Sequence, residues 1–198
     1  SQGDISGAAI HARTALKARP RDPNILQFLG VVSCQLGKKD EGIALLRQAI
    51  VHGGDTDDNR INLAKALAEL GQFDEALKAC APDGNPATPD LQRMHAEILK
   101  LQGRPSDALW VYERLVYENP DDFGCWNNLG TTKLETGDLD GALEAFQKAR
   151  DLDPKSAVVH TNIARVLMAK DRYEDACLML EKAALLNPDD PAPLVELG

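Results

Sequence analysis

The chain has 198 residues, of which 43% are hydrophobic and only 5% aromatic, so its core has to be built mainly from alanine and leucine. The formal net charge is −9, and the acidic excess lies almost entirely after residue 88. This charge argues against binding to nucleic acid or to anionic membranes, because both need a surface rich in lysine and arginine. No apolar run approaches the roughly 20 residues that membrane insertion requires, and no signal peptide opens the sequence.

The cysteines and histidines give no sign of a metal site. Cys34, Cys80, Cys125 and Cys177 are widely spaced, without a CxxC pair, and the four histidines do not accompany them. We therefore predict four buried free thiols and no metal. Free thiols are typical of a reducing compartment, so we expect a cytoplasmic protein.

A repeat of about 34 residues runs through the chain. The residues that mark it are Gly3, Gly37, Gly71, Gly103, Gly137 and Asp171. A small residue follows each marker five positions later, at Ala8, Gly42, Ala76, Ala108, Ala142 and Ala176. A fixed period of this length is the sequence signature of a stacked repeat architecture.

Each repeat is predicted to contain two amphipathic helices. In residues 123–156, apolar residues at helical spacing define them, namely Trp126, Leu129 and Leu134 and then Leu143 and Phe146. The small residues Gly130 and Ala142 would let the two helices approach closely. Asp22, Thr88 and Asp190 each precede a proline, which predicts an N-cap followed by proline at the first helical position.

These residues resemble the pattern of the tetratricopeptide repeat (TPR) family over essentially the whole chain. The resemblance implies an all-α fold, a right-handed α-α superhelix (TPR solenoid) of about 12 antiparallel helices in a single array over residues 1–198. The array would contain a half repeat 3–20, full repeats 23–56, 57–88, 89–122, 123–156 and 157–190, and a partial repeat 191–198. Both ends cut through a repeat, so we expect a fragment of a longer protein; the alternative is that short native ends tuck in without a cap.

The repeat 57–88 is shortened, and the proline-rich stretch ACAPDGNPATPD occupies residues 79–90. Pro82 cannot continue a helix, because it lacks an N–H and its ring clashes with the preceding turn. We predict that the second helix of this repeat ends near Cys80, about one turn early. A longer connector and a local irregularity in superhelical twist would follow.

No catalytic motif is present. The sequence contains no glycine-rich phosphate loop, G-x-S-x-G elbow, HExxH motif or Asp-rich metal loop. The acidic pairs 121–122 and 189–190 fall where helices begin in successive repeats, so we interpret them as helix caps and not as a catalytic dyad. We expect no catalytic residue, no cofactor and no enzyme activity in this region.

In the TPR family the first helix of each repeat lines the concave face, where extended peptides or helices bind. The resemblance therefore gives nine candidate groove residues: Asn62, Lys65, Arg93, Lys100, Asn127, Asn128, Thr131, Asn162 and Arg165. Three of these asparagines share one repeat position and resemble the asparagine ladder of the TPR superhelix in O-linked N-acetylglucosamine transferases, although Phe28 and Met94 interrupt the series. A side-chain amide both donates and accepts, so it can hold a peptide backbone. The alternative is that asparagine is simply common at this position.

The four cationic candidates, Lys65, Arg93, Lys100 and Arg165, would form a sparse basic stripe inside an acidic protein. Such a stripe favours a ligand with an acidic side chain or a C-terminal carboxylate. The alternative is that these charges are scattered and solvated.

The leading hypothesis is a non-catalytic protein–protein interaction scaffold that binds a peptide or helix in the concave groove. The alternative is the TPR targeting region of a larger enzyme, such as a TPR-linked sulfotransferase or glycosyltransferase, because residues 26–50 resemble first repeats of such proteins. A third hypothesis is end-to-end self-association, since uncapped repeat ends would expose apolar helix faces.

Overall fold

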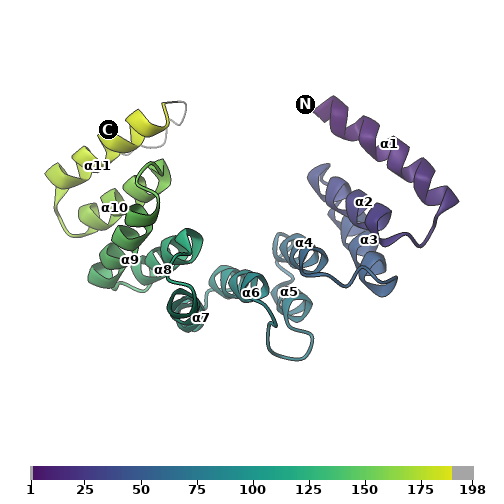
Figure 1. Cartoon of the computed structure of the whole chain (residues 1–198), viewed down its shortest axis with the longest axis horizontal. Helices are drawn as coiled ribbons and strands as arrows, with labels where there is room; N and C mark the ends of the chain where they lie inside the picture. Colours follow the sequence, from purple (N-terminus) through teal and green to yellow (C-terminus); the bar gives the residue numbers. More distant parts are fainter. Residues whose placement is uncertain (1, 189–198) are drawn as a thin grey trace. The chain divides into compact units, whose positions relative to one another are not determined.

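The computed structural model describes residues 2–188, with side chains from residue 7 onward. All regular secondary structure in this part of the chain is α-helical, in eleven helices (Figure 1). The chain divides into two compact units, Ser1–Gly103 (unit 1) and Arg104–Gly198 (unit 2). The division falls inside the predicted repeat 89–122 and not at the proline-rich stretch.

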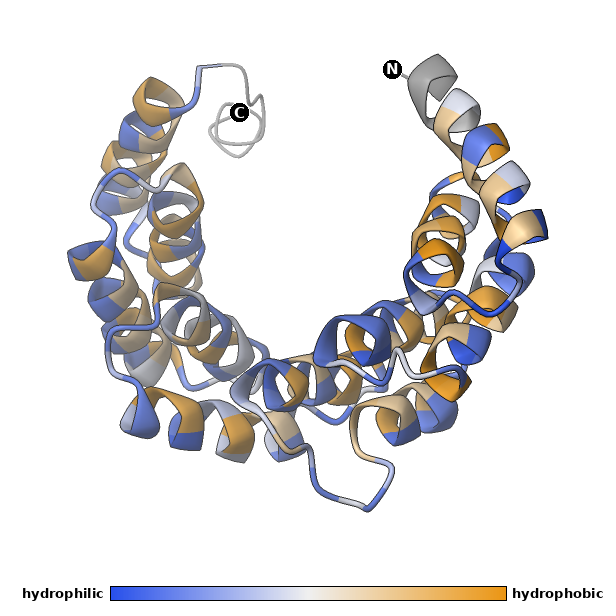
Figure 2. Cartoon of the chain, turned by 45° about the vertical axis from the view of Figure 1, so that its right-hand side comes forward, coloured by the Kyte–Doolittle hydropathy of each residue, from blue (hydrophilic) through white to orange (hydrophobic). Residues whose placement is uncertain are grey.

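Unit 1 contains six helices, and each packs against its neighbour in the chain. They are α1 (Gln2–Ala18), α2 (Pro23–Gln35), α3 (Lys39–Val51), α4 (Asp57–Ala68), α5 (Phe73–Cys80) and α6 (Pro89–Leu101). The apolar residues of α3, α4, α5 and α6 meet in one core. Each helix carries an apolar and a polar side (Figure 2), as expected for amphipathic helices that are buried on one face.

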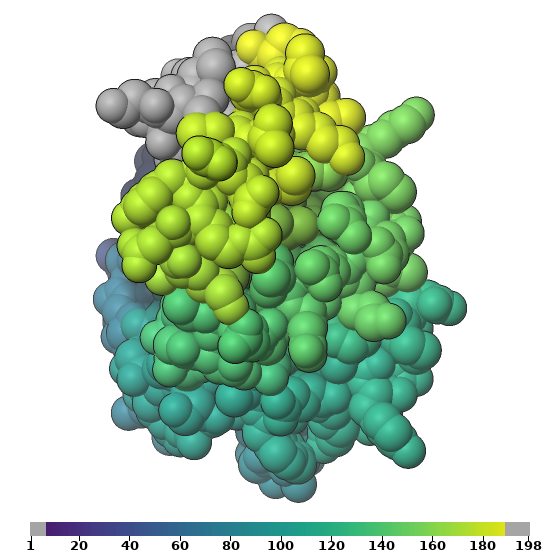
Figure 3. Space-filling model, turned by 90° about the vertical axis from the view of Figure 1, so that its left-hand side faces the viewer, coloured from purple at the N-terminus to yellow at the C-terminus, as the bar shows by residue number. Residues whose placement is uncertain are grey.

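Unit 2 contains the remaining described helices, α7 (Pro105–Glu118), α8 (Phe123–Glu135), α9 (Leu139–Leu152), α10 (Ala157–Ala169) and α11 (Tyr173–Leu186). Successive parts of unit 2 lie as adjacent bands, coloured from green to yellow in Figure 3. The predicted all-α fold is confirmed, with eleven described helices where about 12 were expected. The twelfth would fall in residues 191–198, which lie outside the described part.

Small residues allow the close helix contacts within a repeat. A Cβ at Gly130 on α8 would lie 2.7 Å from the Phe146 ring of α9, so any side chain there would have to displace that ring. Ala142 and Ala149, on the same face of α9 as Phe146, are completely buried. The predicted role of the small residues in helix packing is therefore confirmed for this pair of helices.

Three of the predicted helix caps form. Asp22 Oδ1 accepts hydrogen bonds from the backbone N–H groups of Asn24 and Ile25, and Asp122 Oδ1 accepts one from Cys125. Thr88 Oγ1 accepts a bond from Leu91 N–H at 3.5 Å. These bonds satisfy backbone donors that a helix leaves unpaired at its start. Of the pair 121–122, Asp122 is thus confirmed as a helix cap, whereas the pair 189–190 lies outside the described residues.

The short helix α5 ends at Cys80, as predicted, and spans 8 residues. The guanidinium group of Arg60 holds the end of this helix, because Nη1 donates to the Ala79 carbonyl at 3.2 Å while the same group is paired with Asp55. Both α4 and α5 still pack against α6. The connector is therefore a break within unit 1, and the predicted change in twist stays a prediction.

The repeat markers that lie between helices, Gly37, Gly71, Gly103, Gly137 and Asp171, have a left-handed backbone conformation, whereas Gly3 lies within α1. Gly137 has φ of 85°, and the marker of the last repeat, Asp171, has φ of 57°. Glycine accepts this conformation without steric cost, whereas aspartate adopts it less readily. The hydroxyl of Tyr173 donates a hydrogen bond to Asp171 Oδ1 at 2.8 Å, which ties the aspartate to this turn.

The prediction that all four thiols are buried is wrong for two of them. Cys80 and Cys125 are buried, but Cys34 is half-buried and Cys177 is exposed on α11. All four are free thiols. Burial raises the pKa of Cys80 to about 12, so this thiol stays protonated at neutral pH.

Residues 2–188 include no helix that is long and apolar enough to cross a membrane. Within the same range, no group of three or more histidine, cysteine, aspartate and glutamate side chains is placed to hold a metal ion.

Candidate functional site

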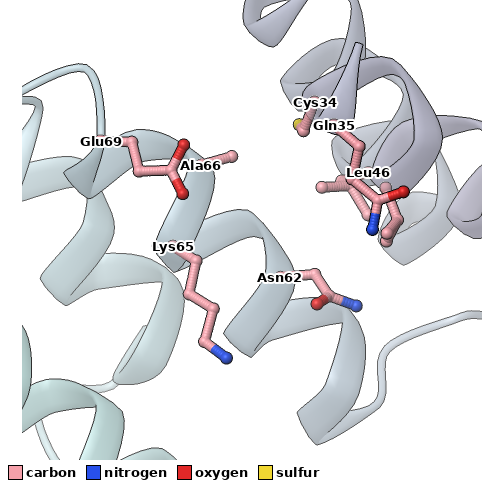
Figure 4. A pocket seen from close by; sticks show the side chains of 8 residues that line it. Cys34, Gln35, Leu46, Asn62, Lys65, Ala66 and Glu69 are labelled. Atoms are coloured by element: carbon pink, nitrogen blue, oxygen red, sulfur yellow. The ribbon is translucent and has the colours of Figure 1, made fainter. Parts of the chain in front are cut away.

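A pocket of about 290 Å³ opens between α2 and α4 in unit 1, which are the first helices of two successive repeats (Figure 4). Its lining residues are Val31, Cys34 and Gln35 of α2, Leu46 of α3, and Asn62, Lys65, Ala66 and Glu69 of α4. The family resemblance assigns the candidate groove residues to the first helices of the repeats, and α4 is one of these helices.

Two of the nine candidate residues, Asn62 and Lys65, lie together in this pocket. They come from the same side of α4, because residues three apart on a helix are neighbours on its surface. Asn62 is half-buried, whereas Lys65 is exposed. The side chains of α4 lie across the pocket from Gln35 of α2 (Figure 4).

The pocket holds one cation that is not neutralised. Among the described residues Lys65 forms no ion pair. The carboxylate of Glu69 is instead paired with Lys39, with an Nζ–Oε2 distance of 2.7 Å. Since Lys39 neutralises Glu69, Lys65 leaves the pocket with a net positive charge.

The thiol of Cys34 forms a neutral part of the pocket wall. Burial raises the pKa of this thiol, and the nearby Glu69 carboxylate raises it further, while Lys39 lowers it in part. A thiol with a raised pKa is protonated at neutral pH and is a weak nucleophile. Cys34 therefore adds apolar surface to this pocket and no reactive group.

Arg93 and Lys100 lie on α6 and do not line this pocket. Arg93 is half-buried, and its Nη2 atom lies 3.1 Å from Asp90 Oδ1 on the same helix. On α6, the repeat position that Asn62 occupies on α4 is taken by Met94, and this side chain is buried. The predicted stripe is therefore represented in the pocket by Lys65 alone.

The five candidates of unit 2 lie on α8 and α10. Asn162 Nδ2 donates to Asn127 Oδ1 at 2.9 Å, so these two amides join the first helices of successive repeats. Thr131 Oγ1 donates to the Asn127 carbonyl of its own helix at 3.0 Å. Asn128 is half-buried, and Arg165 is exposed. Asn162 thus has a structural bond that the ladder interpretation did not foresee.

Sequence reasoning missed the contribution of Glu69, Lys39 and Leu46. The spacing could have indicated Glu69, which follows Lys65 by four residues and so shares its helix face. Nothing in the spacing indicates that Lys39, at the start of another helix, pairs with it.

Family models described as tetratricopeptide repeat match residues 93–157 and 133–194, and a model described as anaphase-promoting complex, cyclosome, subunit 3 matches residues 1–81. The two TPR matches together cover more than half of the chain. With the helical-repeat fold described above, they show that the chain belongs to the tetratricopeptide repeat family.

Among curated proteins, human protein O-mannosyl-transferase TMTC1 is 27% identical over 195 residues, which cover 96% of this chain and 22% of that protein. Cellulose synthase 2 operon protein C of Komagataeibacter xylinus is 26% identical, over 94% of this chain and 16% of that protein. The chain thus spans less than a quarter of the length of these relatives.

Solved structures share the fold. A tetratricopeptide repeat protein from Parabacteroides merdae aligns with a TM-score of 0.78 and 16% identity, over 99% of this chain and 77% of that one. YrrB, described as a TPR protein with an unusual peptide-binding site, aligns with a TM-score of 0.63 and 21% identity, over 93% of this chain and 96% of that one. At these identities the likeness establishes the architecture alone.

Proposed function

We propose that this chain is a protein-interaction scaffold, and that the pocket between α2 and α4 binds an extended peptide with an acidic side chain or a C-terminal carboxylate. The observation that carries the proposal is the position of Asn62 and Lys65 together in a pocket of about 290 Å³. The description of YrrB as a protein with a peptide-binding site supports the same class of function.

Each part of the pocket suits one part of such a peptide. The amide of Asn62 can donate to a peptide carbonyl and accept from a peptide N–H. The ammonium group of Lys65 can form a charge-assisted hydrogen bond with a carboxylate. Val31 and the thiol of Cys34, both partly exposed, offer apolar surface for an adjoining side chain.

The first helices of unit 2 are proposed to contact partners in a similar way. Asn128 would bind peptide backbone, and Arg165 would attract acidic groups, while the Asn127–Asn162 pair keeps α8 and α10 in register. Arg93 and Lys100 on α6 remain candidates for contacts beyond the pocket of unit 1.

Selection from a random peptide library on the immobilised chain tests the proposal. We expect selected peptides to be enriched in aspartate, glutamate or free C-termini. Their affinity should fall roughly tenfold or more in the double variant Asn62→Ala, Lys65→Glu, because one charge-assisted hydrogen bond is removed and one repulsion is added. Lys182→Glu on α11 is the matched control, since it makes the same charge change away from the pocket. Unchanged affinity in the double variant would refute the assignment of this pocket.

A second candidate function is that of a TPR region within a larger enzyme. The match of human protein O-mannosyl-transferase TMTC1 to 96% of this chain favours it. The complete reading frame around the chain decides this point. A frame that encodes no catalytic domain would exclude the candidate, and a frame that encodes a glycosyltransferase domain would support it.

A further inference from the structure

Unit 2 has a pocket on a different face from the site of unit 1. It has a volume of about 190 Å³ and lies between α7 and α9, the second helices of two successive repeats, with α8 contributing its inner side chains. Its lining residues are Glu113 and Val116 of α7, Trp126, Leu129 and Lys133 of α8, and Gly141, Glu144 and Ala145 of α9.

Gly141 makes room for this pocket. Gly141 directly precedes Ala142, the small residue that follows the repeat marker by five positions. At the equivalent position the other full repeats have an acidic residue, namely Glu41, Glu75, Asp107 and Asp175. A Cβ at Gly141 would lie 2.2 Å from Asp138 Oδ2 and 2.9 Å from Lys133 Nζ. The glycine therefore leaves space for these two charged groups at the edge of the pocket.

The charges at the pocket are predominantly negative. Lys133 Nζ lies 3.1 Å from Asp138 Oδ2 and 3.5 Å from Glu113 Oε1, so one ammonium group is shared by two carboxylates. Glu144 lines the same pocket and has no ion-pair partner among the described residues. Nearly all of the net charge of −9 falls in the sequence of unit 2. A cationic group of a partner would therefore complement the excess of carboxylates at this pocket.

Aromatic side chains continue this surface on α7. Trp110 and Tyr117 are 61% and 87% exposed, and with Glu113 they lie on one side of the helix at spacings of three and four residues. The guanidinium carbon of Arg114 lies 5.0 Å from the centre of the Trp110 ring, which orders the indole. Trp126 is also fixed, because its Nε1 donates to the Pro120 carbonyl at 2.8 Å. Tryptophan and tyrosine are among the residue types that dominate interface energetics.

We infer that this face of α7 and α9 is a docking surface for a basic segment of a partner protein. An arginine or lysine side chain of the partner enters between Glu113 and Glu144, beside the indole of Trp126, and apolar atoms of the same segment cover Trp110 and Tyr117. Charge complementarity selects this partner over an acidic one, since an acidic segment would meet unpaired Glu144. This surface is separate from the proposed peptide pocket of unit 1.

The two tryptophans of the chain both belong to this surface, so their indole N–H resonances report directly on its occupancy. The probe is the blocked tripeptide acetyl-Leu-Arg-Leu-amide, and the control is the same peptide with uncharged citrulline in place of arginine. We expect both indole resonances to shift in a saturable manner with the arginine peptide and not with the citrulline peptide. The apparent Kd should weaken roughly tenfold in Glu144→Gln, which removes a carboxylate that has no partner to release.

Glu181→Gln on α11 is the matched control, because it removes an exposed carboxylate outside the pocket and should leave the Kd unchanged. The double variant Asn62→Ala, Lys65→Glu should also leave it unchanged, so failure of this surface and failure of the unit 1 pocket are distinguishable. Far-ultraviolet circular dichroism confirms that each variant is folded. Equal shifts with both peptides, no shift at millimolar peptide, or an unchanged Kd in Glu144→Gln would each overturn the inference.

Discussion

The two units use the same helical repeat but open it on different faces. In unit 1 the pocket lies between the first helices α2 and α4, and its unpaired charge is the ammonium group of Lys65. In unit 2 the pocket lies between the second helices α7 and α9, and its unpaired charge is the carboxylate of Glu144. Under the two proposals above, unit 1 would bind acidic ligands and unit 2 basic ones.

The two units share a buried small residue at one repeat position and differ at the residue directly before it. Ala76 of α5 and Ala142 of α9 occupy the same repeat position, and both are completely buried. The residues directly before them are Glu75 and Gly141, and the glycine lines the pocket of unit 2. The packed small residue is thus kept in both units, while the residue beside it is an acidic side chain in one unit and a pocket-lining glycine in the other.

The largest expected effect concerns the cores of the two units. Leu46 and Phe146 are both completely buried. Truncation should cost about 2–5 kcal/mol for Leu46→Ala and about 3–5 kcal/mol for Phe146→Ala, because each leaves a cavity. Hydrogen exchange measured by mass spectrometry should show faster exchange in α2–α4 for the first variant and in α8–α10 for the second. Equal acceleration in both units for either variant would show that the two cores are one cooperative system.

An intermediate effect is expected from Lys39→Met, which leaves Glu69 without its partner. The free carboxylate of Glu69 would then offset the positive charge of Lys65. The affinity of unit 1 for acidic peptides, measured by calorimetric titration, should therefore fall about three- to tenfold. The pKa of Cys34 should rise further, because Lys39 lowers it in the native chain. Alkylation of Cys34, followed in a Cys177→Ser background, should accordingly slow at mildly alkaline pH. Lys182→Met is the control, and faster alkylation or unchanged affinity would contradict the assigned role of Lys39.

The smallest expected effect is that of Asp138→Asn in unit 2. The Gly141 N–H, and then Lys133, lower the pKa of Asp138. Its charge therefore stabilises the fold at pH values above the unfolded pKa of about 3.9 and ceases to do so as the pH falls through the lower folded value. Asparagine keeps the cap but not the charge, so the loss should be about 0.5 kcal/mol near neutral pH. Urea unfolding should show this difference vanish in strong acid; a difference that persists there would indicate another cause.

Much of the fold could be predicted from the sequence, because it depends on local signals. The end of α5 at Cys80 follows from Pro82, and the caps at Asp22, Thr88 and Asp122 follow from residue type and position. Asn62 and Lys65 could be placed on one side of the first helix of their repeat because their positions within the repeat are fixed, but the pocket itself was not predicted. These predictions require only the period of the repeat and the chemistry of single residues.

Contacts between repeats could not be predicted in the same way. The Asn127–Asn162 bond and the Lys39–Glu69 pair join residues about one repeat apart, and their formation depends on side-chain rotamers that the period does not determine. The exposure of Cys177 could have been anticipated, because it follows the buried Ala176 and so points about 100° away from it. Predicting the unit 2 pocket would have required the relative positions of side chains from three helices, α7, α8 and α9, which the period of the repeat does not give.

The distribution of aromatic residues gives the two units different optical properties. Every tryptophan and tyrosine of the chain, Trp110, Tyr112, Tyr117, Trp126 and Tyr173, lies in unit 2, whereas unit 1 has only phenylalanine as an aromatic residue. The tryptophan and tyrosine absorption and fluorescence therefore arise from unit 2 alone, while the far-ultraviolet signal of the helices comes from both units. Comparing the two signals during one unfolding experiment separates the melting of each unit without any label.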